Sequence, residues 1–252
     1  MEHGAWQWTL GRQRIAWGSG RIWNPTDRFN PVQPTALEPE QKLGVDALQA
    51  RWRYSGFGGV RAVFAPGRKA HGLSRKWALR WADTLAGQDV ALLLARTGEE
   101  KIVGFDLTGN MHDAGYRFEG LRASGGAMGS YAQIVIGLDG TWRRDYLPNG
   151  LYLALEYFFN GARQGGQRVI DRVQALSRQQ LGALAGYDLT PLWRLDLMVL
   201  ADLEQTGLFF APRLRWSFKE NVDIELLGQW PGGRGAYAAF SPTTALQLKY
   251  YF

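Results

Sequence analysis

The last eleven residues of the chain, 242–252, place the strongest constraint on its fold. They read P-T-T-A-L-Q-L-K-Y-Y-F, so apolar and polar side chains alternate along them. Because successive side chains of a β-strand point to opposite faces, this alternation predicts an extended strand with one apolar face. The residues on that face are Leu246, Leu248, Tyr250 and Phe252. The fold must therefore place this apolar face against other apolar material.

The same alternation recurs along the chain and predicts about fourteen strands in a single domain, residues 1–252. All-β barrels commonly reach this length as one unit. No apolar run approaches the roughly 18 to 20 residues that a spanning helix needs. We expect strands at 5–16, 44–54, 58–65, 76–84, 89–96, 101–109, 114–123, 130–142, 151–160, 180–188, 192–202, 207–218, 221–230 and the terminal segment.

Two further patterns indicate that these strands cross a membrane. The connections alternate between short turns, such as 55–58, and longer loops, such as 17–34, which is typical of outer-membrane barrels. Aromatic residues fall near the strand ends, for example Trp52 beside a short turn and Phe64 and Trp77 beside a longer loop. Aromatic belts of this kind mark both interfaces of a membrane. The sequence therefore predicts a transmembrane antiparallel up-and-down β-barrel.

Composition narrows the classes of partner and chemistry. The chain has no cysteine, which excludes a disulfide framework and thiol chemistry. Its net charge is +6, but the basic residues are not clustered in one run, so we expect no nucleic-acid partner. Its three histidines are His3, His71 and His112, and no pair has the spacing of a metal site or a catalytic triad. We expect no catalytic residue, no metal and no cofactor.

Several segments carry a family resemblance. The pattern W-G-x-G-x-x-x-N-P-x-D occurs at 17–27, G-F-D-L-T-G-N-M-H-D-A-G at 104–115, N-G-L-Y-L-A-L-E-Y-F-F-N-G at 149–161 and A-P-R-L-R-W-S-F-K-E-N-V-D-I at 211–224. With these segments the chain resembles the porin-like outer-membrane barrels of Gram-negative bacteria, whose members are largely uncharacterised. The motifs are structural, and none of them is catalytic.

The resemblance has implications for location and partners. It implies a protein of the bacterial outer membrane that contacts lipid and is inserted by the barrel insertion machinery, with Tyr250 and Phe252 as the terminal signal. Met1 is followed by no recognisable signal peptide. Family members usually carry additional residues before the first motif. We therefore expect this chain to be either a mature form or an N-terminally truncated one, and whether early strands are missing stays open.

Charged residues alternate with the apolar face and are candidates for lining a pore. They form either a cross-strand lattice of ion pairs that stiffens the wall or a charged constriction that selects solutes with a mild anion preference. The candidate pore-lining residues are Arg51, Arg53, Arg61, Arg80, Arg117, Glu119, Glu156, Arg194, Asp196, Arg213, Arg215, Asp223, Glu225 and Lys249.

The long segment 17–34 is a candidate constriction loop. Two Asn-Pro steps and a third proline exclude regular structure within it. It either folds into the barrel and narrows it or packs over the mouth. Its candidate residues are Trp17, Trp23, Asn24, Asp27, Arg28 and Phe29. A second long connection, 160–178, has apolar residues at helical spacing and predicts a short surface helix.

These observations predict a porin-like channel through which small hydrophilic solutes diffuse passively. One alternative is a soluble β-barrel that binds a small apolar ligand, which requires an apolar interior and a polar exterior. Another is an outer-membrane enzyme, which requires a nucleophile or paired carboxylates with a base near the rim. The many charges on one face of the predicted strands favour the channel.

Overall fold

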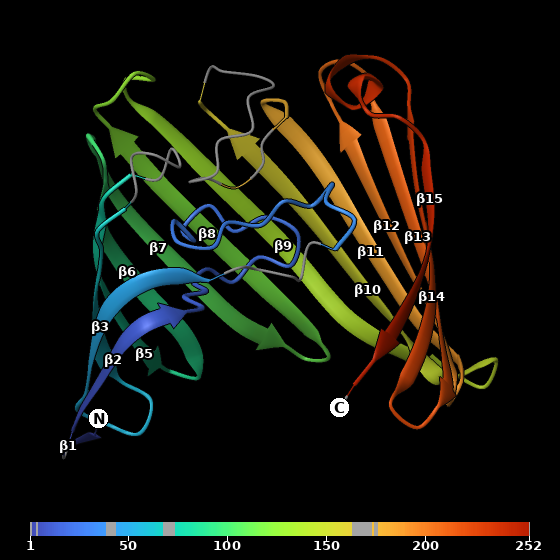
Figure 1. The fold of residues 1–252 in the computed structure, drawn as a ribbon, viewed down its shortest axis with the longest axis horizontal. Coiled ribbons are helices and arrows are strands. Elements are labelled where there is room, and N and C mark those ends of the chain that lie inside the picture. Colours follow the sequence, from blue (N-terminus) through green and yellow to red (C-terminus); the bar gives the residue numbers. More distant parts are fainter. Residues whose placement is uncertain are drawn as a thin grey trace.

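The computed structural model describes residues 2–3, 5–38, 44–67, 74–162, 173 and 176–251. They form one antiparallel sheet in which each strand pairs with its neighbours in the chain (Figure 1). The all-β up-and-down fold is therefore confirmed. The strands are β1 (Glu2–His3), β2 (Trp6–Gln13), β3 (Val45–Arg53), β4 (Gly59–Ala65), β5 (Lys76–Leu85), β6 (Gln88–Thr97), β7 (Glu100–Met111), β8 (Ala114–Ser124), β9 (Tyr131–Arg144), β10 (Leu147–Asn160), β11 (Gln179–Thr190), β12 (Trp193–Asp202), β13 (Leu208–Lys219), β14 (Val222–Gly232) and β15 (Thr243–Tyr250).

The strands β2 to β15 coincide with the fourteen predicted ones, and the differences lie at their ends. The turn predicted at 143–150 is shorter in the structure, where it comprises Asp145 and Tyr146, because β9 continues to Arg144 and β10 begins at Leu147. The two strands stay paired across a register shift between Leu147 and Leu151. A ladder of backbone hydrogen bonds can extend through polar residues, since it does not depend on an apolar face. The helix predicted within 160–178 falls mostly outside the described residues.

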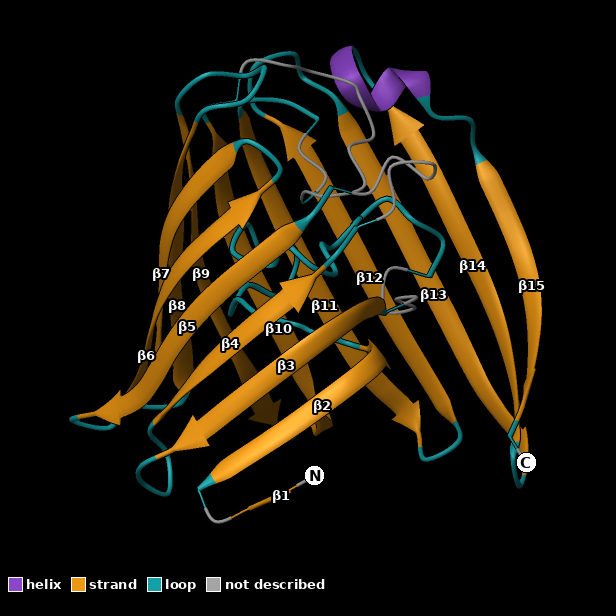
Figure 2. Cartoon of the chain, turned by 60° about the vertical axis from the view of Figure 1, so that its left-hand side comes forward, coloured by secondary structure: helices purple, strands orange, loops and turns teal. Residues whose placement is uncertain are grey.

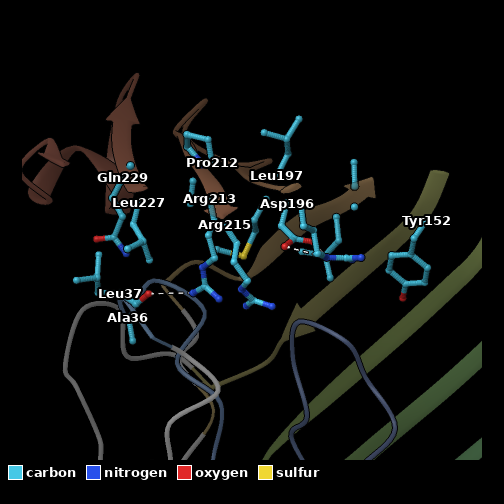
Figure 3. Close-up of a pocket in the computed structure, with 17 residues that line it drawn as sticks. Ala36, Leu37, Tyr152, Asp196, Leu197, Pro212, Arg213, Arg215, Leu227 and Gln229 are labelled. Carbon is cyan, nitrogen blue, oxygen red and sulfur yellow. Dashed lines mark hydrogen bonds and ion pairs between the residues drawn. The ribbon is translucent and has the colours of Figure 1, made fainter. Parts of the chain in front are cut away.

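The sheet has two chemically different faces. The outer face carries apolar side chains that are exposed, such as Leu94 at 51% and Leu246 at 74%. The opposite, inner face carries charged and polar side chains that are buried, such as Glu119 at 0% and Glu156 at 1%. Alternation along each strand produces the two faces, and in Figure 3 the side chains of Asp196 and Leu197 point to opposite sides of β12.

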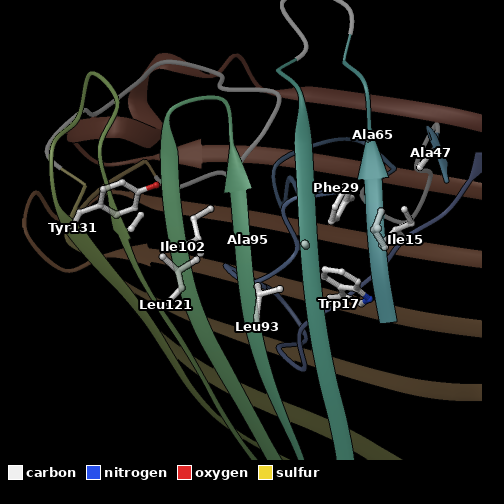
Figure 4. Close-up of a cluster of buried hydrophobic side chains, with 13 residues drawn as sticks. Ile15, Trp17, Phe29, Ala47, Ala65, Leu93, Ala95, Ile102, Leu121 and Tyr131 are labelled. Atoms are coloured by element: carbon white, nitrogen blue, oxygen red, sulfur yellow. The ribbon is translucent and has the colours of Figure 1, made fainter. Parts of the chain in front are cut away.

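The sheet curls around a segment that follows β2. Figures 1 and 2 show residues 14–38 crossing the space that the strands surround. We call these residues the inserted segment. Their apolar side chains pack against small and aliphatic residues on the inner face of β3 to β9, and this cluster is the larger of two buried cores (Figure 4). Its members include Ile15, Trp17, Phe29, Leu93 and Ile102.

The second core joins residues of the inserted segment, such as Ile22 and Trp23, to inner-face residues of β9, β10, β12 and β13. A short 3-10 helix, η2 (Gly235–Ala239), follows β14 and was not predicted. Its Tyr237 is fully buried, lies against Phe209 and donates a hydrogen bond of 2.8 Å to the side chain of Gln180. Burial, with a contribution from the negative charge of Asp202, raises the pKa of Tyr237. Among the described residues, no helix is long and apolar enough to cross a membrane.

Candidate functional site

The inserted segment occupies the inner side of the curled sheet. Sequence analysis left two positions open for 17–34, and the structure places it inside rather than over the mouth. Five of the six candidate constriction residues are buried and Asn24 is partly buried. The buried ones are Trp17, Trp23, Asp27, Arg28 and Phe29.

Glu119 on β8 binds the backbone of the inserted segment. Its carboxylate accepts hydrogen bonds from the N–H groups of Ser19 at 2.8 Å, Gly20 at 3.1 Å and Thr26 at 2.7 Å. The hydroxyl of Thr26 donates a fourth bond, also at 2.7 Å. Because the segment has no regular structure, its N–H groups need partners from elsewhere, and one carboxylate supplies them.

Glu156 on β10 binds the next part of the segment in the same way. It accepts hydrogen bonds from the backbone N–H groups of Arg21, Ile22 at 2.8 Å and Trp23 at 3.2 Å. Hydrogen bonds to charged groups contribute about 1.5 to 3 kcal/mol each. The two glutamates therefore hold residues 19–26 in one position against the inner face.

A buried ion pair fixes the middle of the segment. Arg28 and Glu100 on β7 lie 2.7 Å apart, with side-chain exposures of 1% and 5%. The hydroxyl of Tyr131 contacts both Glu100 oxygens at 3.3 Å, and the amine of Lys76 donates to the backbone carbonyl of Arg28 at 2.6 Å. Breaking a buried pair of this kind typically costs about 3 to 5 kcal/mol, since it leaves one charge uncompensated.

Aromatic contacts also hold the inserted segment against the sheet. Trp17 packs edge-on against Phe29 with ring centroids 5.2 Å apart, and Trp23 stacks on Phe158 of β10 at 5.4 Å. Trp23 approaches the wall closely because β11 has Gly182 beneath it. A Cβ atom there would lie 2.8 Å from two ring atoms of Trp23. A side chain at position 182 would therefore displace the indole.

A cavity of about 320 Å³ remains between the inserted segment and β11 to β14 (Figure 3). Arg213 reaches across it and donates a hydrogen bond of 3.2 Å to the backbone carbonyl of Leu37 in the segment. The cavity wall mixes charged, amide, phenolic and apolar groups. Residues that line it include Tyr152, Asp196, Met198, Arg213, Arg215 and Gln229.

Ion pairs connect the inner wall around this cavity. Arg215 contacts Glu225 at 2.8 Å, and Lys249 on β15 contacts the same carboxylate at 2.9 Å. Lys249 also reaches Glu38 at the end of the inserted segment, 3.1 Å away. Arg194 pairs with Asp196 at 2.9 Å. A cross-strand lattice and a charged cavity therefore coexist on this part of the wall.

All fourteen candidate pore-lining residues lie on the inner face of the sheet, but three of them are fully buried, and of these Glu225 is covered by its partners Arg215 and Lys249. Glu119 and Glu156 are covered by the inserted segment, so the pore-lining assignment is corrected for both. Arg117 is also engaged, since it contacts Asp139 at 2.8 Å and the backbone carbonyl of Ser19 at 3.1 Å. Of the two terminal-signal residues, Tyr250 ends β15 on the outer face, and Phe252 lies outside the described residues.

Sequence reasoning missed several residues that hold the segment, notably Thr26, Glu100 and Tyr131. A usable signal was the run 89–96, which is apolar on both faces. In the structure its inner side chains pack against the inserted segment. Apolar residues on both faces of a strand therefore indicated that something covers the inner one.

The side chains around the cavity are charged, amide, phenolic and apolar groups. Within the described ranges, no group of three or more histidine, aspartate and glutamate side chains could hold a metal ion. Comparison of the sequence with known protein families and with curated proteins found no match.

Proposed function

We propose that this protein is a porin-like channel of the bacterial outer membrane for passive diffusion of small hydrophilic solutes. The observation that carries the proposal is the inverted distribution of side chains: large apolar residues are exposed on the outer face, and charged residues lie inside. A soluble ligand-binding barrel has the opposite distribution. Exposed apolar surface of this extent is typical of a surface that contacts lipid or a partner.

The aromatic residues of the outer face support a membrane location. Trp193 of β12 and Trp216 of β13 stack with centroids 5.0 Å apart near the short turns, and Phe210 of β13 and Trp230 of β14 lie 5.7 Å apart toward the other end of the sheet. Two aromatic levels separated by aliphatic side chains match the two interfaces of a bilayer. In this proposal lipid contacts the band between them, and the terminal strand with Tyr250 is recognised by the insertion machinery.

The proposed route for solutes passes beside the inserted segment. In the membrane the strands close into a barrel, because unpaired backbone groups of an open sheet edge do not occur in hydrocarbon. The segment then acts as a fixed constriction, since Glu119, Glu156 and Glu100 hold it against one side of the wall. The cavity lined by Arg213 and Arg215 is the space left for the solute.

Conductance in a planar lipid bilayer tests this proposal. The wild-type protein should produce discrete current steps, and heat-denatured protein should produce none. A deletion variant replaces residues 16–29 by a short glycine-serine linker. Its ends, Ile15 and Asn30, are already close in the structure, because the side-chain amide of Asn30 donates a 2.8 Å hydrogen bond to the carbonyl of Ile15. The conductance step of this variant should be clearly larger. A protein that inserts but stays silent in both forms would exclude the channel.

A further inference from the structure

Three arginines stand side by side on the inner face of β3, β4 and β5. Arg51 lies directly opposite Arg61, and Arg61 lies directly opposite Arg80. All three are partly buried. We call them the arginine row. Arg53, two residues beyond Arg51 on the same face, adds a fourth guanidinium nearby.

The row is unfavourable without a partner of opposite charge. Like charges directly opposite each other on neighbouring strands destabilise a sheet. Arg61 experiences the positive charges of both Arg51 and Arg80. Arg80 has a carboxylate partner, Asp106, at 3.2 Å. Among the residues that the structure describes, neither Arg51 nor Arg61 has a hydrogen-bonding or ion-pair partner.

This arrangement differs from that of the arginines across the interior. Arg194 and Arg215 are each within 2.9 Å of a carboxylate oxygen, so their charges are already compensated by the protein. Where Arg51 and Arg61 lie opposite each other without a carboxylate from the described part of the chain, the sheet retains a local excess of positive charge. Such an excess is the electrostatic condition for binding an anion from solution.

The geometry also limits the kind of anion. Neighbouring strands lie about 5 Å apart, so the three guanidinium groups can span roughly 10 Å along the row. Each guanidinium presents a planar fork of donors that matches a carboxylate or phosphate group. A monatomic ion such as chloride can use only one fork, whereas an anion with two or more oxygen-bearing charged groups can engage neighbouring forks at once.

We propose that the arginine row is a binding site for small oxyanions with two or more negative charges, of the phosphate or dicarboxylate class. The proposal extends the proposed channel by naming a solute class, and the binding itself does not require conduction. In a channel, the row attracts such anions to the part of the wall that lies away from the cavity.

Isothermal titration calorimetry of the detergent-folded protein tests the site, with pyrophosphate and succinate as probes in chloride buffer. Wild type should bind at least one of the two probes, and the responding probe identifies the oxyanion group. Arg61→Gln should weaken that binding at least about tenfold, equivalent to about 1.4 kcal/mol. Arg12→Gln is the matched control, because it removes the same charge from the outer face of β2, where Arg12 pairs with Asp46.

Thermal unfolding of the same variants without ligand separates binding from a structural role. Arg61→Gln removes a contact between like charges, so its midpoint should equal or exceed that of wild type. A lower midpoint, equal weakening by Arg12→Gln, or the absence of binding to wild type would each overturn the site. The binding site and the proposed channel are tested separately. If the protein binds a probe in an Arg61-dependent way but gives no conductance, the site is supported and the channel is excluded.

Discussion

Glu119 accepts two hydrogen bonds from Thr26, one from its backbone N–H and one from its hydroxyl, both at 2.7 Å. The carboxylate belongs to the sheet and the threonine to the inserted segment, ninety-three residues away in the chain. The pair therefore joins the sheet to the inserted segment directly. A wall residue that carries this many bonds to one segment determines whether that segment stays in place.

Glu119→Gln should release part of the inserted segment. The amide has a similar shape but no charge. Its NH₂ group would also face N–H and O–H groups that donate hydrogen bonds to the carboxylate in the wild type. We expect the free energy of unfolding to fall by about 3 kcal/mol, which corresponds to one or two hydrogen bonds to a charged group. Urea-induced unfolding in detergent measures the loss. Glu99→Gln is the control, because Glu99 is exposed in the turn between β6 and β7 and its substitution should change little.

The strands could be predicted because their pattern is local. Alternation of apolar and polar side chains along β12, for example, requires only that Leu195, Leu197 and Val199 face one way and Arg194 and Asp196 the other. Pairing of neighbouring strands in chain order then follows from the short turns. The excess length of the turn predicted at 143–150 has the same origin, since polar residues at a strand end give no alternation to detect.

The position of the inserted segment could not be predicted, because it depends on contacts between distant residues. Arg117 and Glu119 follow one another on the same face of β8, and both fit the pattern of a charged wall. Which of them faces open space and which binds the segment is decided by the path of residues 14–38. Only the apolar inner residues Leu93 and Ile102 indicated that part of the wall is covered.

Gly182→Ala should displace Trp23 from the wall. The added Cβ would lie 2.8 Å from two atoms of the indole ring, and a rigid ring on a close-packed surface cannot yield without a backbone shift. Overpacking of this kind costs about 1 to 3 kcal/mol. Thermal unfolding should show a lower midpoint. In Gly56→Ala, where a Cβ meets nothing within 4 Å, the midpoint should match wild type; equal losses in both variants would exclude the packing explanation.

Leu94→Arg and Leu85→Arg form a matched pair on the outer face. The two leucines are 51% and 50% exposed, but Leu94 lies between the aromatic levels marked by Trp77 and Trp81, and Leu85 lies at the end of β5. An arginine at the bilayer centre costs about 2 to 4 kcal/mol and near the interface about 0 to 1 kcal/mol. Folding into lipid vesicles should therefore be impaired only by Leu94→Arg. Equal effects would contradict the proposed membrane band.

Arg213→Glu should shift the ion preference of the proposed channel toward cations. Arg213 lines the cavity and donates a hydrogen bond to the backbone carbonyl of Leu37 in the inserted segment, so its charge lies on the proposed route. Reversing that charge makes the narrow part of the route more negative, and the electrostatic effect is strongest where water is least abundant. The reversal potential under a potassium chloride gradient measures the change. Lys219→Glu makes the same charge reversal at the exposed end of β13, where salt screens it, and should move the potential much less. If the two variants move the potential equally, the route does not pass Arg213.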